Sequence, residues 1–152
     1  MNMLSKLLKN KYLHLAIRIL IALVFIIASI EKIADPFDFA NDIKNYDILP
    51  NFLINITAII LPWVELFVGL MILLGIKIKA NSILVIVMLL IFNIAVFSAW
   101  MRGLNIDCGC YGDVAHQTVG WQKLLENFLL IGLSLILYFF PNKSFSFENK
   151  EA

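Results

Sequence analysis

The chain has 152 residues, of which 61% are hydrophobic and 15% charged, and its formal net charge is +1. Soluble domains are about 45 to 50% apolar, so this composition excludes an ordinary soluble domain and indicates an integral membrane protein. Nucleic-acid binding is not indicated, because basic residues gather only in a short amino-terminal stretch. The length suits a single membrane domain, which we assign to residues 1–152.

The sequence contains four apolar runs. Each has nearly the length of roughly 20 residues that a helix needs to cross the hydrocarbon core of a bilayer. They cover residues 12–30, 52–74, 82–99 and 121–140. Because backbone in lipid must satisfy its own hydrogen bonds, these runs predict an all-α, integral membrane four-helix bundle. The first run is longer than the apolar part of a signal peptide and contains Arg18, so we expect it to be retained as a span.

The link between the first two runs predicts a short amphipathic outer helix. Its sequence, DPFDFANDIKNY, places Pro36 at a typical helix start and apolar residues such as Phe37, Ile43 and Tyr46 at helical spacing. Such a helix would lie on the outer membrane surface with its acidic residues facing water. It would cap the bundle or, alternatively, offer a docking surface to a soluble partner. After the fourth run, residues 141–152 predict a short cytoplasmic tail.

Positive charges are unevenly distributed among the links, which predicts the orientation. Lysines precede the first run, join the second to the third and follow the fourth: Lys6, Lys9, Lys11, Lys77, Lys79, Lys143 and Lys150. The other two links carry only Lys32, Lys44 and Arg102. The positive-inside rule therefore places both termini in the cytoplasm, and we assign the protein to a bacterial inner (cytoplasmic) membrane. The segment NIDCGCYGDV, residues 105–114, then faces outward.

The two cysteines of the chain, Cys108 and Cys110, lie in this segment on either side of Gly109. Disulfides persist outside the cytosol, and cysteines two apart can just reach bridging distance if the residue between them bends freely. Such a small ring would be strained, as catalytic or labile bridges are. The pair therefore favours thiol–disulfide exchange. Two alternatives stay open: an inert bridge that stiffens a turn, and a metal site with His116, for which the usual C-x₂₋₄-C spacing is missing.

Ionisable residues within the spans form a second group of candidates. Arg18 and Glu65 fall within about 6 Å of the same depth when each is counted from the cytoplasmic end of its run, so we expect an ion pair between them. Buried pairs fix helix register, but a proton or ligand site is the alternative. Asn93, near the middle of the third run, is expected to hydrogen-bond into the same interior.

A third group is expected near the outer surface: Lys32, Arg102 and Glu126. A cation beside a cysteine stabilises the thiolate that attacks in disulfide exchange, so Lys32 or Arg102 would serve there. Glu126 would accept a proton or pair with Lys32. The alternatives are a snorkelling anchor for Lys32 and a solvated loop charge for Arg102.

These motifs resemble the MauE branch of the DoxX-like membrane proteins, the branch named for methylamine utilisation. The resemblance is carried by IEKIADPFDFANDIKNYDILP, LPWVELFVGLMILLG and CGCYGD, and it extends from about Arg18 to about Phe140. It implies a four-span component that works with a periplasmic thioredoxin-like partner in making or maintaining disulfides. With two cysteines in all, the chain excludes a complete cysteine relay of its own.

Three hypotheses follow for the function. The first is thiol–disulfide exchange between Cys108 and Cys110 and a thioredoxin-like protein outside the cytoplasm. The second is a membrane scaffold or assembly subunit with a structural bridge. The third is a quinone-binding or small-solute transport protein that uses the Arg18 and Glu65 interior, which makes a quinone a possible cofactor. We assign no metal, and the lipid bilayer is the remaining partner.

Overall fold

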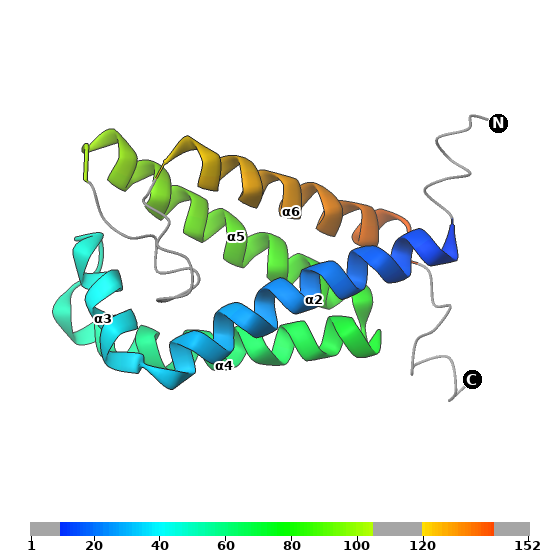
Figure 1. Cartoon of the computed structure of the whole chain (residues 1–152), viewed down its shortest axis with the longest axis horizontal. Helices are drawn as coiled ribbons and strands as arrows, with labels where there is room; N and C mark the ends of the chain where they lie inside the picture. The colour runs from blue at the N-terminus through cyan, green and yellow to red at the C-terminus, as the bar shows by residue number, and fades with distance from the viewer. Residues whose placement is uncertain (1–9, 105–119, 142–152) are drawn as a thin grey trace.

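The structure is a computed structural model that describes residues 10–104 and 120–141. This part of the chain forms five helices: α2 (Lys11–Ala34), α3 (Pro36–Asn45), α4 (Asn51–Leu74), α5 (Ile78–Met101) and α6 (Trp121–Phe139) (Figure 1). Four of them, α2, α4, α5 and α6, are long and apolar enough to cross a membrane. The protein is therefore an all-α, multi-pass membrane bundle, which confirms the predicted fold class.

Capping residues set the boundaries around α2 and α3. The side chain of Asn10 accepts a hydrogen bond from the amide of Tyr12 at the start of α2. The side chain of Asp35 accepts one from the amide of Asp38, and Pro36 occupies the first turn of α3. Asp35 is thus the single residue between the two helices, so the chain turns sharply where α2 ends.

The link between α4 and α5 is a tight turn built on Gly75. This glycine has φ of +73°, a left-handed conformation that favours glycine. Its amide donates to the carbonyl of Ile72 at 3.1 Å, and the amide of Ile76 donates to that of Met71 at 2.9 Å. The two bonds form a Schellman motif, which ends α4 and returns the chain directly into α5.

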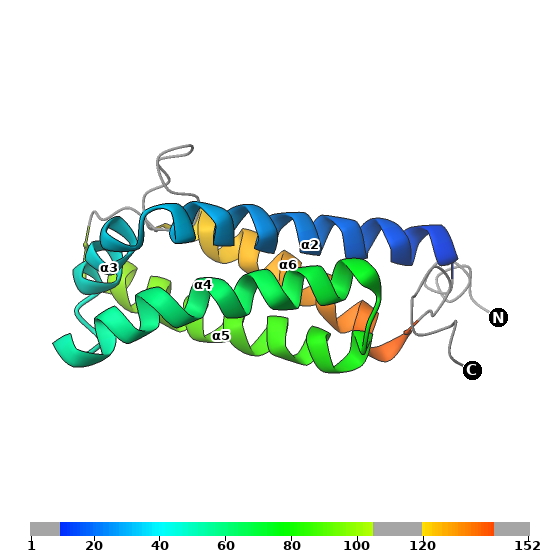
Figure 2. The same cartoon turned by 90° about the horizontal axis from the view of Figure 1, so that it is seen from below.

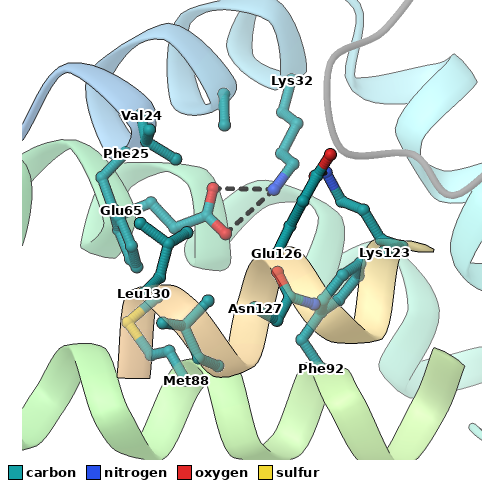
Figure 3. Close-up of a pocket in the computed structure, with 12 residues that line it drawn as sticks. Val24, Phe25, Lys32, Glu65, Met88, Phe92, Lys123, Glu126, Asn127 and Leu130 are labelled. Carbon is teal, nitrogen blue, oxygen red and sulfur yellow. Dashed lines mark hydrogen bonds and ion pairs between the residues drawn. The ribbon is translucent and has the colours of Figure 1, made fainter. Parts of the chain in front are cut away.

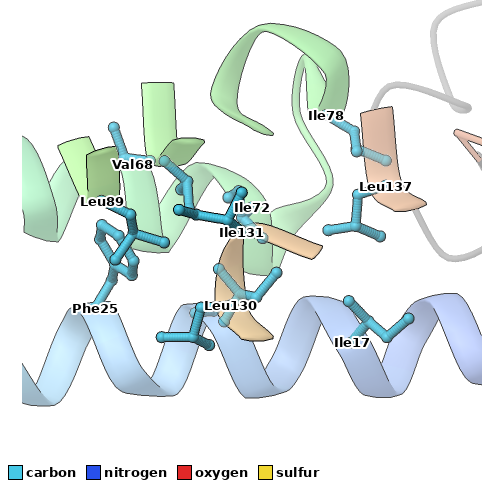
Figure 4. Close-up of a cluster of buried hydrophobic side chains, with 12 residues drawn as sticks. Ile17, Phe25, Val68, Ile72, Ile78, Leu89, Leu130, Ile131 and Leu137 are labelled. Carbon is cyan, nitrogen blue, oxygen red and sulfur yellow. The ribbon is translucent and has the colours of Figure 1, made fainter. Parts of the chain in front are cut away.

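The spans pack most extensively as two pairs, α2 with α4 and α5 with α6. Gly69 lies at the close approach of the first pair: a Cβ there would be 3.1 Å from Cγ1 of Ile26. Aliphatic side chains from all four spans fill the interior, among them Ile21, Ile72, Val85 and Leu137 (Figure 4). The outer faces expose large apolar residues, as expected for helices that contact lipid.

The ends of the helices are staggered, and α3 covers the staggered end. Figure 2 shows α4 extending past the end of α2, with α3 lying over that extension, and α3 packs mainly against α4. Phe39 of α3 and Tyr46 just after it are buried, whereas Phe37 is 86% exposed. The predicted amphipathic helix is confirmed, and its buried face caps the bundle. We refer to this end of the molecule as the α3 end.

Candidate functional site

A partly buried ion pair joins α2 to α4. The ammonium Nζ of Lys32 lies 2.9 Å from Oε1 and 2.8 Å from Oε2 of Glu65, and the two side chains retain only 10% and 13% of their exposure. The ring of Phe39 covers the ammonium, with 5.0 Å between Nζ and the ring centroid, a favourable cation–π arrangement. Figure 3 shows both charged groups pointing into the space between the helices.

This pair lies near mid-height of α4, because Glu65 is 14 residues after Asn51 and nine before Leu74. At 1.5 Å per residue these separations are about 21 and 14 Å. Lys32 reaches this level because α2 ends at Ala34, well short of the end of α4. Its side chain points inward to Glu65, although it lies only two residues from the end of its helix.

The predicted ion pair between Arg18 and Glu65 is wrong. The guanidinium of Arg18 donates from Nε to the carbonyl of Ile72 at 3.0 Å and from Nη2 to that of Leu73 at 2.8 Å, while Glu65 pairs with Lys32. The error arises because the apolar runs do not begin and end at the same level. The turn at Gly75 lies beside Arg18, so the first seven residues of α2, Lys11 to Ile17, extend past it.

In its observed position Arg18 binds the carboxyl end of α4. The side chain is 1% exposed, and its charge lies against carbonyl groups of the last turn of α4, which lack the usual i+4 amide donor; that of Ile72 also accepts from Gly75. A cation at this end also complements the helix dipole. Arg18 is therefore a structural cap that joins α2 to the α4–α5 turn.

A second set of polar side chains comes from α6 and α5. Nζ of Lys123 lies 2.9 Å from Oε2 of Glu126; the lysine side chain is 5% exposed and the glutamate 50%. One residue further on, the amide of Asn127 donates to Oδ1 of Asn93 at 2.8 Å. The expectation that Asn93 hydrogen-bonds into the interior is confirmed. Lys123 was not among the predicted residues, although its spacing from Glu126 and Asn127 places all three on one face of a helix.

These side chains surround a cavity of about 80 Å³ (Figure 3). All four spans contribute to its wall. Its polar lining is Lys32, Glu65, Lys123, Glu126 and Asn127, and apolar groups that include Val24, Ala28, Met88 and Phe92 complete it. Lys32 and Glu126 thus line the same cavity. Of the two roles expected for Glu126, the pairing with Lys32 is wrong, because Lys32 pairs with Glu65 and Glu126 with Lys123. A mostly apolar wall with a few convergent polar groups is typical of a binding site.

Arg102, the remaining predicted cation, lies elsewhere. Its guanidinium donates to the carbonyl oxygens of Ser98 and Tyr46, which ties the end of α5 to the segment that follows α3. Burial, reinforced by the nearby charge of Asp42, raises the pKa of the Tyr46 hydroxyl above its usual range. Cys108, Cys110 and His116 lie outside the described residues, in the segment between Leu104 and Gly120.

Comparison with known sequences decides the family. The family model described as methylamine utilisation protein MauE matches residues 10–140. The chain belongs to the MauE family. The match runs from the cap of α2 to the end of α6, so it includes both the cavity and the cysteine segment. The MauE resemblance inferred from the sequence motifs is confirmed.

Individual relatives support the MauE assignment. The methylamine utilization protein MauE of Paracoccus denitrificans is 30% identical over 123 residues, which are 80% of this chain and 66% of that protein. The MauE protein of Paracoccus versutus is 25% identical over 132 residues, 86% of this chain and 71% of that protein. That of Methylophilus methylotrophus is 29% identical over 123 residues, 80% of this chain and 65% of that protein. The chain thus spans about two thirds of the length of these MauE relatives. No solved structure matches it significantly.

Proposed function

We propose that this member of the MauE family is a membrane component of thiol–disulfide exchange outside the cytoplasm. Cys108 and Cys110 pass redox equivalents to or from a soluble thioredoxin-like protein. The observation that carries the proposal is the CGC sequence itself: the chain has two cysteines, one glycine apart, within a family match that covers the bundle. The relatives are named for methylamine utilisation, and the proposal concerns thiol chemistry rather than a growth substrate.

The proposed exchange balances within the two proteins. A thiolate of the reduced partner attacks one sulfur of the Cys108–Cys110 bridge, and the other sulfur leaves as a thiolate. The second thiol of the partner then resolves the mixed disulfide. The partner loses two electrons and becomes a disulfide, while this chain gains them as a dithiol. The reverse direction uses the same steps, and either way a further redox protein must restore the starting state.

The proposed orientation in the bacterial inner membrane rests on charge and on the bundle. The start of α2, the α4–α5 turn and the end of α6 lie together at one end (Figure 1), and this end carries Lys11, Lys77 and Lys79. The α3 end carries the exposed Lys44 and Arg102, and its other two cations, Lys32 and Lys123, are held in ion pairs. In the sequence, Lys6, Lys9, Lys143 and Lys150 add to the charge of the first end. The positive-inside rule favours a cytoplasmic location for the first end. The α3 end, and the cysteine segment with it, would then face outward.

Thiol trapping in cells tests the exchange. Cells that express the full chain are quenched with acid, and free thiols are tagged with a maleimide that shifts the mobility of the protein on a gel. We expect the Cys108/Cys110 pair to be partly reduced and partly oxidised, since a catalytic pair cycles between the two states. The Cys108→Ala and Cys110→Ala variants are the matched pair: the variant that retains the attacking sulfur should accumulate a mixed disulfide with a thioredoxin-like protein.

A variant with both cysteines replaced is the control and should form no such adduct. A pair that is fully oxidised under all growth conditions, with no adduct in either single variant, would contradict the exchange. That result would favour the scaffold hypothesis, in which the bridge only stiffens the outer segment.

A further inference from the structure

The cavity between the spans carries charged side chains in a region where such groups are costly. A charged side chain near the middle of a bilayer costs several kcal/mol unless it is paired or hydrated. The Lys32–Glu65 pair lies near mid-height of α4, and its two side chains still retain 10% and 13% of their exposure. Both residues line the cavity, so they border the space that would hydrate them.

The polar side chains of α6 and α5 beside the cavity differ in exposure, from the accessible Glu126 to the buried Lys123, Asn127 and Asn93. Glu126 is 50% exposed and its partner Lys123 only 5%, so this ion pair runs from an accessible carboxylate to a buried ammonium. Behind Lys123, Asn127 is 3% exposed and Asn93 is 5% exposed. Glu126 lies five residues after the start of α6, about 8 Å along the helix. The accessible carboxylate therefore lies in the half of α6 that is nearer the α3 end.

The buried amide pair of Asn127 and Asn93 has a hydrogen-bond donor that is not used within the described residues. Asn127 donates to Oδ1 of Asn93, but Nδ2 of Asn93 is buried and has no acceptor among residues 10–104 and 120–141. A buried polar group without a partner costs about 1 to 3 kcal/mol. Asn127, the partner of Asn93, lines the cavity, so a water molecule bound beside this amide pair would supply the acceptor.

The volume of the cavity indicates what it holds. A water molecule in a polar cavity requires about 10 to 15 Å³ by this kind of measure, so 80 Å³ accommodates roughly five. An aromatic ring requires more space: benzene binds in an engineered cavity of about 150 Å³. Water also suits the lining, since it donates to the carboxylates and accepts from the ammonium and amide groups.

We propose that this cavity is a water-filled vestibule that opens toward the α3 end and hydrates the Lys32–Glu65 ion pair in the middle of the membrane. Solvent from that side of the membrane reaches Glu65 through it, past Glu126. The vestibule is a property of the bundle and does not depend on the chemistry of the cysteine pair.

Cysteine accessibility tests the vestibule with two matched pairs of neighbouring residues. Ala28 and Met88 line the cavity, whereas Ile27 and Val87, one residue away at nearly the same depth, are 47% and 45% exposed on the lipid-facing side. Each is replaced by cysteine in the full chain with Cys108→Ser and Cys110→Ser. The reagent is the small cation 2-aminoethyl methanethiosulfonate, added to intact cells with their outer membrane permeabilised.

The reagent attacks only thiolates, and thiols ionise in water but not in hydrocarbon. We expect Ala28→Cys and Met88→Cys to be modified at least about tenfold faster than Ile27→Cys and Val87→Cys, because only the first two border water. Unreacted thiols are counted afterward with a maleimide in denaturant, and size-exclusion chromatography checks that each variant is folded. The proposal requires the difference in both pairs, so equal rates within either pair of folded variants overturn it.

Discussion

Replacing Gly75 with alanine should destabilise the bundle far more than the same replacement at Gly103. Both glycines have positive φ, +73° and +67°, so an alanine at either position incurs the strain of a left-handed residue, about 1 to 2 kcal/mol. They differ in what the new methyl group would meet. At Gly103 no heavy atom of residues 10–104 and 120–141, apart from its chain neighbours, lies within 4 Å of the new Cβ. At Gly75 the Cβ would lie 2.3 Å from Nη2 and 2.8 Å from Cζ of Arg18.

The guanidinium of Arg18 must therefore move when Gly75 becomes alanine. It is 1% exposed and bonded to the carbonyls of Ile72 and Leu73, so moving it breaks both hydrogen bonds. Hydrogen bonds to charged groups contribute about 1.5 to 3 kcal/mol each. We expect Gly75→Ala to lower the free energy of unfolding by about 3 to 6 kcal/mol more than Gly103→Ala does.

The assay is equilibrium unfolding in mixed micelles of dodecyl maltoside and SDS, followed by far-ultraviolet circular dichroism. A double-mutant cycle with Arg18→Met isolates the clash. In the Arg18→Met background, Gly75→Ala should cost only the backbone strain, about 1 to 2 kcal/mol. If Gly75→Ala costs the same with and without Arg18, or the same as Gly103→Ala, the assignment of Arg18 as the cap of α4 is refuted.

Three further predictions concern other parts of the bundle. Lys32→Met should lower the free energy of unfolding by about 3 kcal/mol because it leaves Glu65 unpaired. Adding Glu65→Leu should recover most of that loss in the same assay. If the single and double variants lose the same free energy, the ion pair is contradicted. Burial and the nearby Asp42 raise the pKa of Tyr46, so the fold favours the protonated phenol. Stability from this source is complete below pH of about 10, the pKa in the unfolded chain, and declines above it. Between about pH 9 and 11, the free energy of unfolding should therefore depend less on pH in Tyr46→Phe than in the unmodified protein. The same pH dependence in both would exclude Tyr46 as the cause of that dependence. Gly132→Ala places a Cβ that meets no other part of the described chain within 4 Å, its own helix backbone aside. This variant should be neutral or stabilise α6 by up to about 1 kcal/mol, and a marked loss of stability would reveal a contact made outside the described residues.

The spans were predictable because their determinants are local. The predicted and observed ends differ most at two places. The first run was predicted to end at residue 30, and α2 ends at Ala34; the third was predicted to begin at residue 82, and α5 begins at Ile78. In both places polar residues continue a helix past the end of its apolar run. The helix that begins at Pro36 was also predictable, since a proline in the first turn and an aspartate cap are local signals.

The partners of the charged residues were only partly predictable. Glu65 and Lys32 were identified as candidates, but pairing requires the axial register between α2 and α4, and hydropathy does not encode register. That register follows from shape: Gly69 lets α4 approach Ala22 and Ile26 closely, and Gly75 leaves room for the guanidinium of Arg18. Once these contacts are made, Glu65 lies opposite Lys32.

The sequence by itself determined that the chain is a helical membrane protein with four spans and an amphipathic helix, and its motifs indicated the MauE family. These properties depend on the residues of one segment at a time, because lipid obliges each span to satisfy its own backbone hydrogen bonds. Only the tertiary structure decided which charges meet and that a cavity lies among them. Those outcomes depend on how far each helix slides past its neighbours, which is set by side-chain packing between segments distant in the sequence.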